Sequence, residues 1–273
     1  MKYSVDHDYH IHSFLSPCSH DELQTPERIF RYAEENGFRE ICLTNHFWDA
    51  DVIGSYGAPY DQTYEYIAQS MPLPQSDKIK FHFGCETDMD KNFVLGISPQ
   101  AFEKMEFVVI STTHLQLTGK TIDPGATLEQ RAELYIKRIE KVMAHNFDFT
   151  KVGIAHPASC HASPEIPFNE LFGKIGEENI RRVFNIIAKS GAGVEINAVD
   201  FNFKDKSAAH VQSIINLYAI LKQCGCRFYF ASDAHHPEAL QNAPKIFENA
   251  VNELGLTEDD RFIPRFSSVS QGR

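Results

Sequence analysis

Residues 8–20, with the sequence DYHIHSFLSPCSH, contain histidines that are spaced for metal binding. His10 and His12 are separated by one residue, so on a β-strand their imidazoles point to the same side. Two imidazoles on one side can chelate one ion, and histidine is the commonest metal ligand in proteins. A single H-x-H pair also occurs where histidines merely flank a core residue, so the positions of the other histidines decide between the two interpretations.

Potential metal ligands recur at the ends of seven predicted strands. These strands are apolar runs over residues 3–12, 40–46, 78–86, 106–114, 151–156, 193–197 and 227–235. Each ends in a potential ligand or its near neighbour, namely His10 and His12, His46, Glu86, His114, His156, Glu195, and Asp233 with His235. Randomly placed histidines would lie on helices and loops about as often as at strand ends. Five histidines do lie away from the predicted strand ends, namely His82, His145, His161, His210 and His236.

Helical patterns separate most of these strands. One helix is predicted after the N-cap Thr25, with Pro26 in its first position and Gly37 at its end. Others are predicted over residues 127–145, 177–190 and 207–223, with one or two short helices to finish the chain. Strands that alternate with helices are typical of parallel sheets. We therefore predict an α/β fold, a seven-stranded (β/α) barrel forming a single domain over residues 1–273, with an open doubly wound sheet as the competing architecture.

In such a barrel the C-terminal ends of the strands lie on one face, where active sites form. The potential ligands would therefore converge on one pocket although they are far apart in the sequence. A mixture of imidazoles and carboxylates suits zinc, manganese, iron or cobalt, and it argues against a closed structural site made of cysteines.

Composition narrows the partners and the compartment. The chain has 26 basic and 37 acidic residues, hence a net charge of −11 with neutral histidine, and a field of that sign repels nucleic acid and anionic membranes. It also repels a phosphorylated substrate unless bound cations supply local positive charge. Six cysteines without a C-x-x-C pair, no signal peptide and no long apolar run predict a cytoplasmic chain with reduced thiols.

The motifs DYHIHS, SPCSH, LTNH, GCETD, STTH, GIAHP, EIN and SDAH, taken in order, resemble those of the polymerase and histidinol phosphatase (PHP) superfamily of metal-dependent phosphoesterases. The resemblance extends over residues 8–235 and is greatest to the monofunctional histidinol-phosphatase branch. It implies a distorted, TIM-like seven-stranded barrel with a centre of three divalent metal ions, which would be zinc, manganese or iron.

The resemblance also implies the ligands and the chemistry. By motif position, one ion would be bound by His10, His12, Glu86 and Asp233, a second by Glu86, His114 and His156, and a third by His20, His46 and His235. Metal-activated hydroxide would attack a small phosphomonoester, with Glu86 and Asp233 as catalytic groups and L-histidinol phosphate as a candidate substrate. The sequence makes no prediction of the oligomeric state.

Several further residues are expected around this centre. Asn197, Lys204 and His161 are candidates for substrate contacts, and Asp8 and Glu195 for orienting the histidines. Two positions depart from the family pattern: Asn45 stands where an acidic residue usually precedes the histidine, and the segment after EIN offers Lys204 where the histidinol-phosphatase branch tends to have an arginine.

Two other function classes remain as alternatives. A metal-dependent amidohydrolase also carries H-x-H on its first strand, but it usually has a bridging lysine on a middle strand, where this chain has His114. That class gives no role to His20, His46 or Glu86. A non-catalytic metal-binding barrel would be expected to have gaps in its ligand set, and the sequence shows none.

Overall fold

The computed structural model describes residues 1–56, 62–162 and 166–266, and its strands form one parallel sheet. The sheet has the order β1-β2-β4-β5-β6-β7-β8, and β3 lies beside β4. The strands are β1 (His7–Ile11), β2 (Glu40–Leu43), β3 (His46–Phe47), β4 (Lys80–Asp88), β5 (Phe107–Ser111), β6 (Val152–Ile154), β7 (Gly193–Asn197) and β8 (Arg227–Ala231). Since β2 and β3 both pair with β4 and are separated by two residues, they form one interrupted strand, and the seven predicted strands are confirmed.

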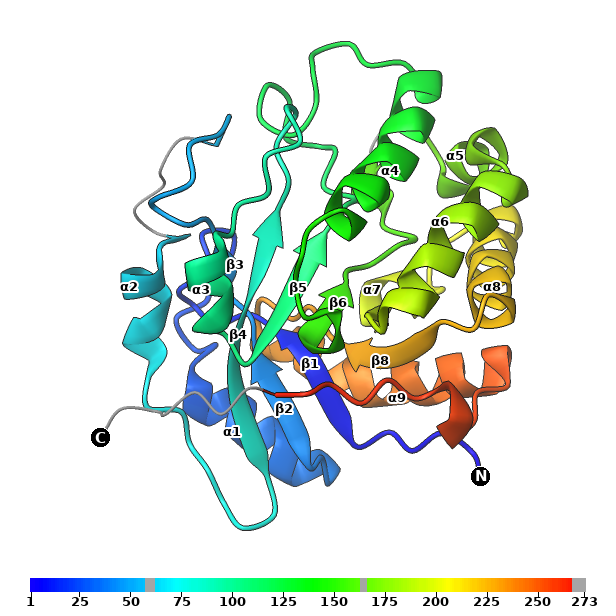
Figure 1. The fold of residues 1–273 in the computed structure, drawn as a ribbon. Coiled ribbons are helices and arrows are strands. Elements are labelled where there is room, and N and C mark those ends of the chain that lie inside the picture. The colour runs from blue at the N-terminus through cyan, green and yellow to red at the C-terminus, as the bar shows by residue number, and fades with distance from the viewer. Residues whose placement is uncertain (57–61, 163–165, 267–273) are drawn as a thin grey trace.

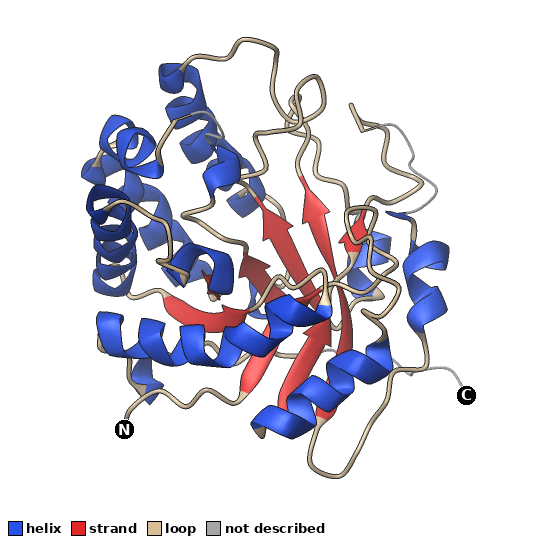
Figure 2. Cartoon of the chain, turned by 180° about the vertical axis from the view of Figure 1, so that it is seen from behind, coloured by secondary structure: helices blue, strands red, loops and turns tan. Residues whose placement is uncertain are grey.

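Helices surround the sheet on its outer side (Figures 1 and 2). They are α1 (Pro26–Asn36), α2 (Tyr64–Ile67), α3 (Pro99–Glu103), α4 (Leu128–Met143), α5 (Phe168–Ile175), α6 (Glu177–Ser190), α7 (Ala198–Phe201), α8 (Ala208–Gln223) and α9 (Pro237–Leu254). Short 3-10 helices cover Ala68–Ser70, Phe149–Lys151, Cys160–Ala162 and Glu258–Asp260. None of the helices in the described part of the chain combines the length and the apolar character that crossing a bilayer requires.

The helix boundaries follow the sequence signals closely. The Thr25 side chain accepts a hydrogen bond from the backbone of Arg28, and Gly37 takes the left-handed conformation that ends α1. The expected one or two short helices at the end of the chain are instead a single helix, α9. Its buried face holds it against the barrel although Pro244 inside it removes a backbone donor.

The first and last strands meet, which nearly closes the sheet into a barrel. The Asp233 amide donates to the His10 carbonyl over 2.8 Å, and the Ser232 amide donates to Asp8 Oδ1 over 2.9 Å. Ile11 also forms a parallel bridge with Ala234. The predicted α/β barrel is therefore confirmed, and an open doubly wound sheet is excluded.

Alternate strand residues face two separate apolar cores. On β5, Val108 and Ile110 pack with the helices, whereas Phe107 and Val109 belong to a second cluster inside the curved sheet. This inner cluster also includes Phe262, whose amide donates to the Phe228 carbonyl over 2.8 Å. The C-terminal segment thus fills the lower end of the barrel, and the polar residues at the strand ends occupy the upper end.

Candidate metal centre

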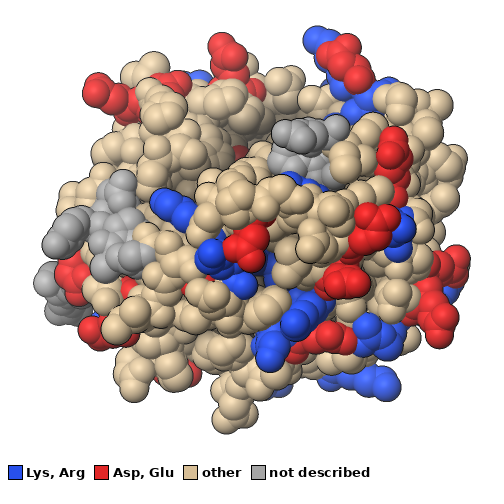
Figure 3. Space-filling model, turned by 90° about the horizontal axis from the view of Figure 1, so that it is seen from above, with Lys and Arg blue, Asp and Glu red and all other residues tan. Residues whose placement is uncertain are grey.

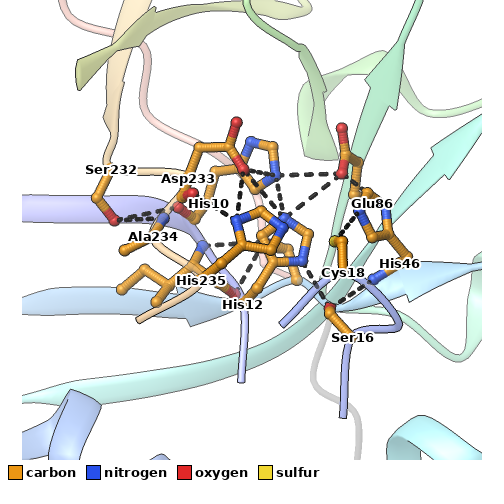
Figure 4. Close-up of polar contacts among 12 residues, drawn as sticks. His10, His12, Ser16, Cys18, His46, Glu86, Ser232, Asp233, Ala234 and His235 are labelled. Atoms are coloured by element: carbon orange, nitrogen blue, oxygen red, sulfur yellow. Dashed lines mark hydrogen bonds and ion pairs between the residues drawn. The ribbon is translucent and has the colours of Figure 1, made fainter. Parts of the chain in front are cut away.

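The upper end of the barrel gathers the candidate ligands into three overlapping groups. In each group the ligand atoms lie within 4.8 Å of one another. The groups are His10 with His12 and Glu86, Glu86 with His114 and His156, and His12 with His46 and His235. Residues from the ends of five strands and from the segment after β8 therefore converge, as expected from the sequence. Figure 4 shows those from β1, β3, β4 and the segment after β8.

Glu86 lies at the centre of these groups. Its Oε1 is 3.2 Å from His156 Nε2, and its Oε2 is 2.9 Å from His46 Nδ1 and 3.5 Å from Nε2 of both His10 and His12. The β3–β4 register makes His46 and Glu86 direct partners. Burial raises the pKa of Glu86, but the neighbouring imidazoles, with His46 first, outweigh burial and hold this pKa well below its usual range. The Glu86 carboxylate is therefore an anion.

Five histidines direct Nε2 toward the centre because a fixed partner occupies Nδ1. The Nδ1 partners are Glu195 for His10 at 2.8 Å, Ser16 for His12 at 2.7 Å, Asp88 for His114 at 2.9 Å, Thr113 for His156 at 2.7 Å and the Asp233 carbonyl for His235 at 2.8 Å. Such partners set the tautomer and the ring orientation of metal-binding histidines. This repeated arrangement is typical of a metal centre and would be improbable for unrelated buried imidazoles.

Two features show that a cation fits the first group. The Nε2 atoms of His10 and His12 are 2.9 Å apart, and when both rings are neutral and donate from Nδ1 to Glu195 and Ser16, the two Nε2 lone pairs point at one another. Glu86 Oε2 is buried without a hydrogen-bond partner and faces these rings. A shared cation would remove the lone-pair repulsion and satisfy the buried carboxylate oxygen.

Asp233 completes the first group from the segment after β8. Its Oδ1 lies 3.2 Å from His12 Nε2 and 3.6 Å from His10 Nε2. The backbone φ angles of Asp233 and His156 are 52° and 24°, in a region that non-glycine residues seldom adopt. Strain of this kind persists where surrounding structure enforces it and is common at functional sites.

The third group differs from the expected set of His20, His46 and His235. The structure places His12 with His46 and His235, while His20 is exposed and belongs to none of the three groups formed by described residues. Cys18, two residues earlier, has its Sγ 3.1 Å from His46 Nε2. From its sequence position Cys18 was expected to be a small buried residue and not a thiolate ligand, but the structure exposes it beside a histidine of the third group.

A cavity of about 500 Å³ opens beside the three groups. Glu86, His114, Asp233 and His235 contribute to its wall, together with polar residues that include Tyr56, Gln62, Gln116, Lys120 and His161. Figure 3 looks onto the end of the molecule toward which β4 and β5 point, and it shows basic side chains interspersed with acidic ones there. Lys120, which the sequence analysis missed, is the one lysine or arginine among the described residues of the wall.

The three expected substrate contacts lie in different surroundings. His161 lines the cavity. Burial, and to a smaller extent the charges of His114 and His156, lowers the pKa of His161 to about 4. Asn197 is buried, and its amide donates to Glu195 Oε1 over 2.6 Å and to Asp233 Oδ2 over 3.2 Å. Lys204 is exposed on the loop after α7 and is not among the described residues that line the cavity.

Asp8 does not contact the imidazoles that it was expected to orient. Its carboxylate accepts hydrogen bonds from the Ser232 amide and from the Tyr32 hydroxyl, at 2.9 Å and 3.1 Å. Burial raises the pKa of Asp8 to about 7. Asn45, which stands where related sequences usually have an acid, accepts hydrogen bonds from Ser13 and Ser16 and so supports the loop after β1.

Comparison with a solved histidinol phosphate phosphatase supports the fold. The histidinol phosphate phosphatase of Lactococcus lactis, solved with zinc, L-histidinol and phosphate, has a TM-score of 0.65 at 18% identity, over 94% of this chain and 98% of that one. The phosphotriesterase homology protein of Escherichia coli, solved with phosphate in its active site, has a TM-score of 0.46 at 11% identity, over 94% and 95% of the two chains. No curated protein sequence matches this chain.

A family model identifies the chain more directly. The PHP-domain model matches residues 8–199, a segment that begins in β1 and ends in α7. It contains seven of the nine residues that the sequence motifs assign to metal binding, all except Asp233 and His235. Because this match covers more than half of the sequence, the protein belongs to the PHP-domain family.

Proposed function

We propose that this chain is a metal-dependent phosphatase that hydrolyses a small phosphomonoester. The observation that carries the proposal is the sharing of Glu86 between two groups of inward-facing imidazoles beside an open cavity. A closed structural site would bury all of its ligands, whereas a catalytic site keeps positions open for water and substrate. A cavity of about 500 Å³ has the size of a small-molecule site.

Charge explains why the centre needs cations to bind phosphate. Glu86, Asp88 and Asp233 line the cavity, and Lys120 is the one described lysine or arginine there. This excess of carboxylates would repel a phosphate dianion. Divalent ions, which we expect to number three and to be zinc, manganese or iron, would supply positive charge for the phosphate oxygens and the acidity that makes water a nucleophile near neutral pH.

The chain's own residues would orient the substrate and handle protons. Lys120 and His161 lie in the cavity wall, where a cation and a neutral imidazole can donate hydrogen bonds to phosphate oxygens. Asp233 has 18% of its side chain exposed, whereas Glu86 has 1%. Asp233 is therefore the better placed of the two carboxylates to exchange a proton with the leaving oxygen, and Glu86 serves to hold the ions.

L-histidinol phosphate is the first substrate to test. The Lactococcus lactis enzyme with the same fold was solved with L-histidinol and phosphate, which are the products of that ester's hydrolysis. The absence of an arginine after EIN and the position of Lys204 outside the cavity wall separate this chain from the usual histidinol-phosphatase pattern. A set of small phosphomonoesters therefore has to accompany L-histidinol phosphate in the test.

The deciding experiment measures phosphate release and metal content together. Purified protein loaded with zinc or manganese is assayed against the phosphomonoesters and against N-acylated amino acids, and elemental analysis counts the ions. We expect close to three ions per chain and turnover of at least one ester. Cleavage of amides alone would indicate an amidohydrolase, and a metal-loaded chain that is inert toward both classes would indicate a non-catalytic barrel.

Glu86→Ala gives the matched test of the site. This variant should lose metal and phosphatase activity together, because Glu86 is common to two groups. Glu106→Gln is the control. Glu106 Oε2 lies 2.6 Å from His82 Nδ1, and neither residue is among the described residues that line the cavity. Full turnover by Glu86→Ala would refute the role proposed for Glu86.

A further inference from the structure

The loop between β1 and α1 folds back over the third group of histidines. Two successive turns shape it, in which the Ser16 amide donates to the Ser13 carbonyl over 3.0 Å and the Ser19 amide donates to the Ser16 carbonyl over 2.8 Å. Cys18 lies inside the second turn. The loop therefore has a defined path over residues 13–19, and the direction of each side chain follows from it.

Serine side chains tie both flanks of Cys18 to the histidines. Ser16 Oγ lies 2.7 Å from His12 Nδ1 and accepts a hydrogen bond from the His46 amide over 3.3 Å. On the other flank, Ser19 Oγ donates to the His235 carbonyl over 2.7 Å. All three histidines of the third group are thus linked to the turn that contains Cys18.

These anchors aim the Cys18 thiol at the group. Its Sγ lies 3.1 Å from His46 Nε2, and Cys18 lines the same cavity as His46 and His235 (Figure 4). Sulfur and nitrogen ligands on one tetrahedral zinc ion are about 3.5 Å apart, given bond lengths of about 2.3 Å and 2.0 Å. A small shift of either side chain would accommodate an ion between Sγ and Nε2.

Two further observations indicate that a cation belongs in this cluster. The ligand atoms of His12, His46 and His235 lie within 4.8 Å of one another. Glu86 Oε2, on a side chain that is 1% exposed, has no hydrogen-bond partner and lies 2.9 Å from His46 Nδ1. Cys18 and His20 are both exposed, but Cys18 Sγ contacts His46, whereas His20 belongs to none of the three groups formed by described residues.

We propose that Cys18, and not His20, is the ligand that this loop gives to the ion held by His46 and His235. The inference rests on the proposed metal-dependent function, because it concerns an ion of the same centre. A thiolate among imidazoles makes this position softer than the other two groups, which offer only nitrogen and oxygen. The third position should therefore prefer zinc, cobalt or cadmium to manganese or magnesium.

Cobalt substitution tests the assignment on the full chain, because a cobalt–thiolate bond gives a charge-transfer absorption that nitrogen and oxygen ligands do not give. Wild-type protein titrated with cobalt should show this absorption. Cys18→Ser should lose this absorption and should bind one cobalt ion at least roughly tenfold more weakly. Removing only the hydrogen-bonding partner of a ligand already costs about that much affinity. His20→Ala should keep both the absorption and the affinity.

Other cysteines provide the controls. Cys224→Ser alters a half-buried thiol that contacts the Arg181 carbonyl and precedes β8, at the opposite end of that strand from the centre. Cys160→Ser tests the cysteine whose side chain lies outside the described part. Both variants should retain the absorption. Alkylation of the wild-type protein, followed by mass spectrometry, needs no variant. Bound zinc should protect Cys18 from alkylation, and a chelator should restore the modification of Cys18.

The outcomes separate this inference from the proposed function. Cobalt bound without a thiolate absorption, or an absorption that persists in Cys18→Ser, overturns the assignment of Cys18 even if the protein is an active phosphatase. Loss of one ion in His20→Ala with full retention in Cys18→Ser overturns it as well. A thiolate absorption in a protein that hydrolyses no ester would support Cys18 and refute the phosphatase.

Discussion

Nδ1 of His10 lies 2.8 Å from Oε2 of Glu195, and both side chains are fully buried. Two other donors hold the same carboxylate: the Tyr229 hydroxyl bonds to Oε2 over 3.1 Å, and the Asn197 amide bonds to Oε1 over 2.6 Å. The carboxylate is therefore fixed on three sides, and it leaves His10 only Nε2 for contact with the centre.

Neutralising Glu195 should weaken metal binding. In Glu195→Gln the amide can no longer accept from all of its present donors, so the orientation and basicity of His10 change. We expect metal affinity to fall on the order of 10- to 100-fold, as for other partners of metal-binding histidines. Titration with a competing chelator measures this, with Glu106→Gln as the matched buried carboxylate. Equal affinity in the two variants would contradict a role for Glu195 in the centre.

Removing the ions should lower the thermal stability. Glu86 Oε2 is buried without a hydrogen-bond partner, and the His10 and His12 Nε2 atoms face one another, so the empty centre is costly. An ion present at 1,000 times its Kd contributes about 4 kcal/mol per site. Treatment with a chelator should therefore lower Tm by roughly 10 °C for each site that loses its ion, measured by circular dichroism.

The chelator experiment has an internal control. Added zinc should restore the Tm of the wild type, while Glu86→Ala should respond little to either treatment. A wild-type Tm that does not change with chelator, in protein whose loss of metal is verified, would mean that the histidine groups are stable without ions.

Lys120 and Lys204 allow a paired test of substrate binding. Lys120 lines the cavity, with its Nζ 5.4 Å from the centre of the Tyr56 ring, whereas Lys204 is exposed elsewhere. Lys120→Ala should raise KM for the best phosphomonoester about fivefold, which corresponds to about 1 kcal/mol for a solvent-exposed ion pair. Lys204→Ala should leave KM unchanged. The reverse result would restore Lys204 as the phosphate contact predicted from the sequence.

Asp6 should contribute to stability in a manner that depends on pH. Burial opposes the shift, but hydrogen bonds with His7 and Arg261 lower its pKa from 3.8 to about 2. As pH falls, the unfolded chain takes up the proton first, so the stabilisation is present above pH 4 and is lost as the pH approaches 2. The shift corresponds to about 2 kcal/mol.

Asp6→Asn should therefore have a lower free energy of unfolding than the wild type at pH 6, and this difference in free energy should become smaller toward pH 3. Urea denaturation at several pH values measures the free energies of unfolding. Asp259→Asn, an exposed acidic residue in the nearby 3-10 helix, should show no such trend. A difference that is constant with pH would show that the Asp6 carboxylate charge does not contribute.

The strand ends were predictable because β-strands carry a strong local pattern. A short apolar run that stops at a histidine or carboxylate marks both the strand and its ligand, and parallel strands align those ends on one face. This was enough to place the ligands in one pocket, whereas the grouping of His10 with His12 and Glu86, and of Glu86 with His114 and His156, came from the resemblance to the PHP superfamily. Short helices such as α3 and α7 were missed because four or five residues hold too few turns to show a period.

Positions that depend on loop geometry could not be predicted in the same way. Cys18 is placed by hydrogen bonds that Ser16 accepts from His46 and Ser19 donates to His235, and Lys120 lies on an irregular segment before α4. His20 was expected to be a ligand because of the family resemblance, yet it follows the anchored turn and lies in none of the three groups of described residues. Spacing alone does not give the direction of a side chain where the backbone has no regular repeat.

The hydrogen bond between the Asp233 amide and the His10 carbonyl joins the two ends of the barrel at the candidate metal centre. During synthesis His10 and His12 leave the ribosome long before Asp233 and His235. A nascent chain therefore offers an ion only part of its coordination sphere and releases it readily. Firm metal capture would follow translation of the last strand, so that loading of the ions and completion of the polypeptide are linked in time.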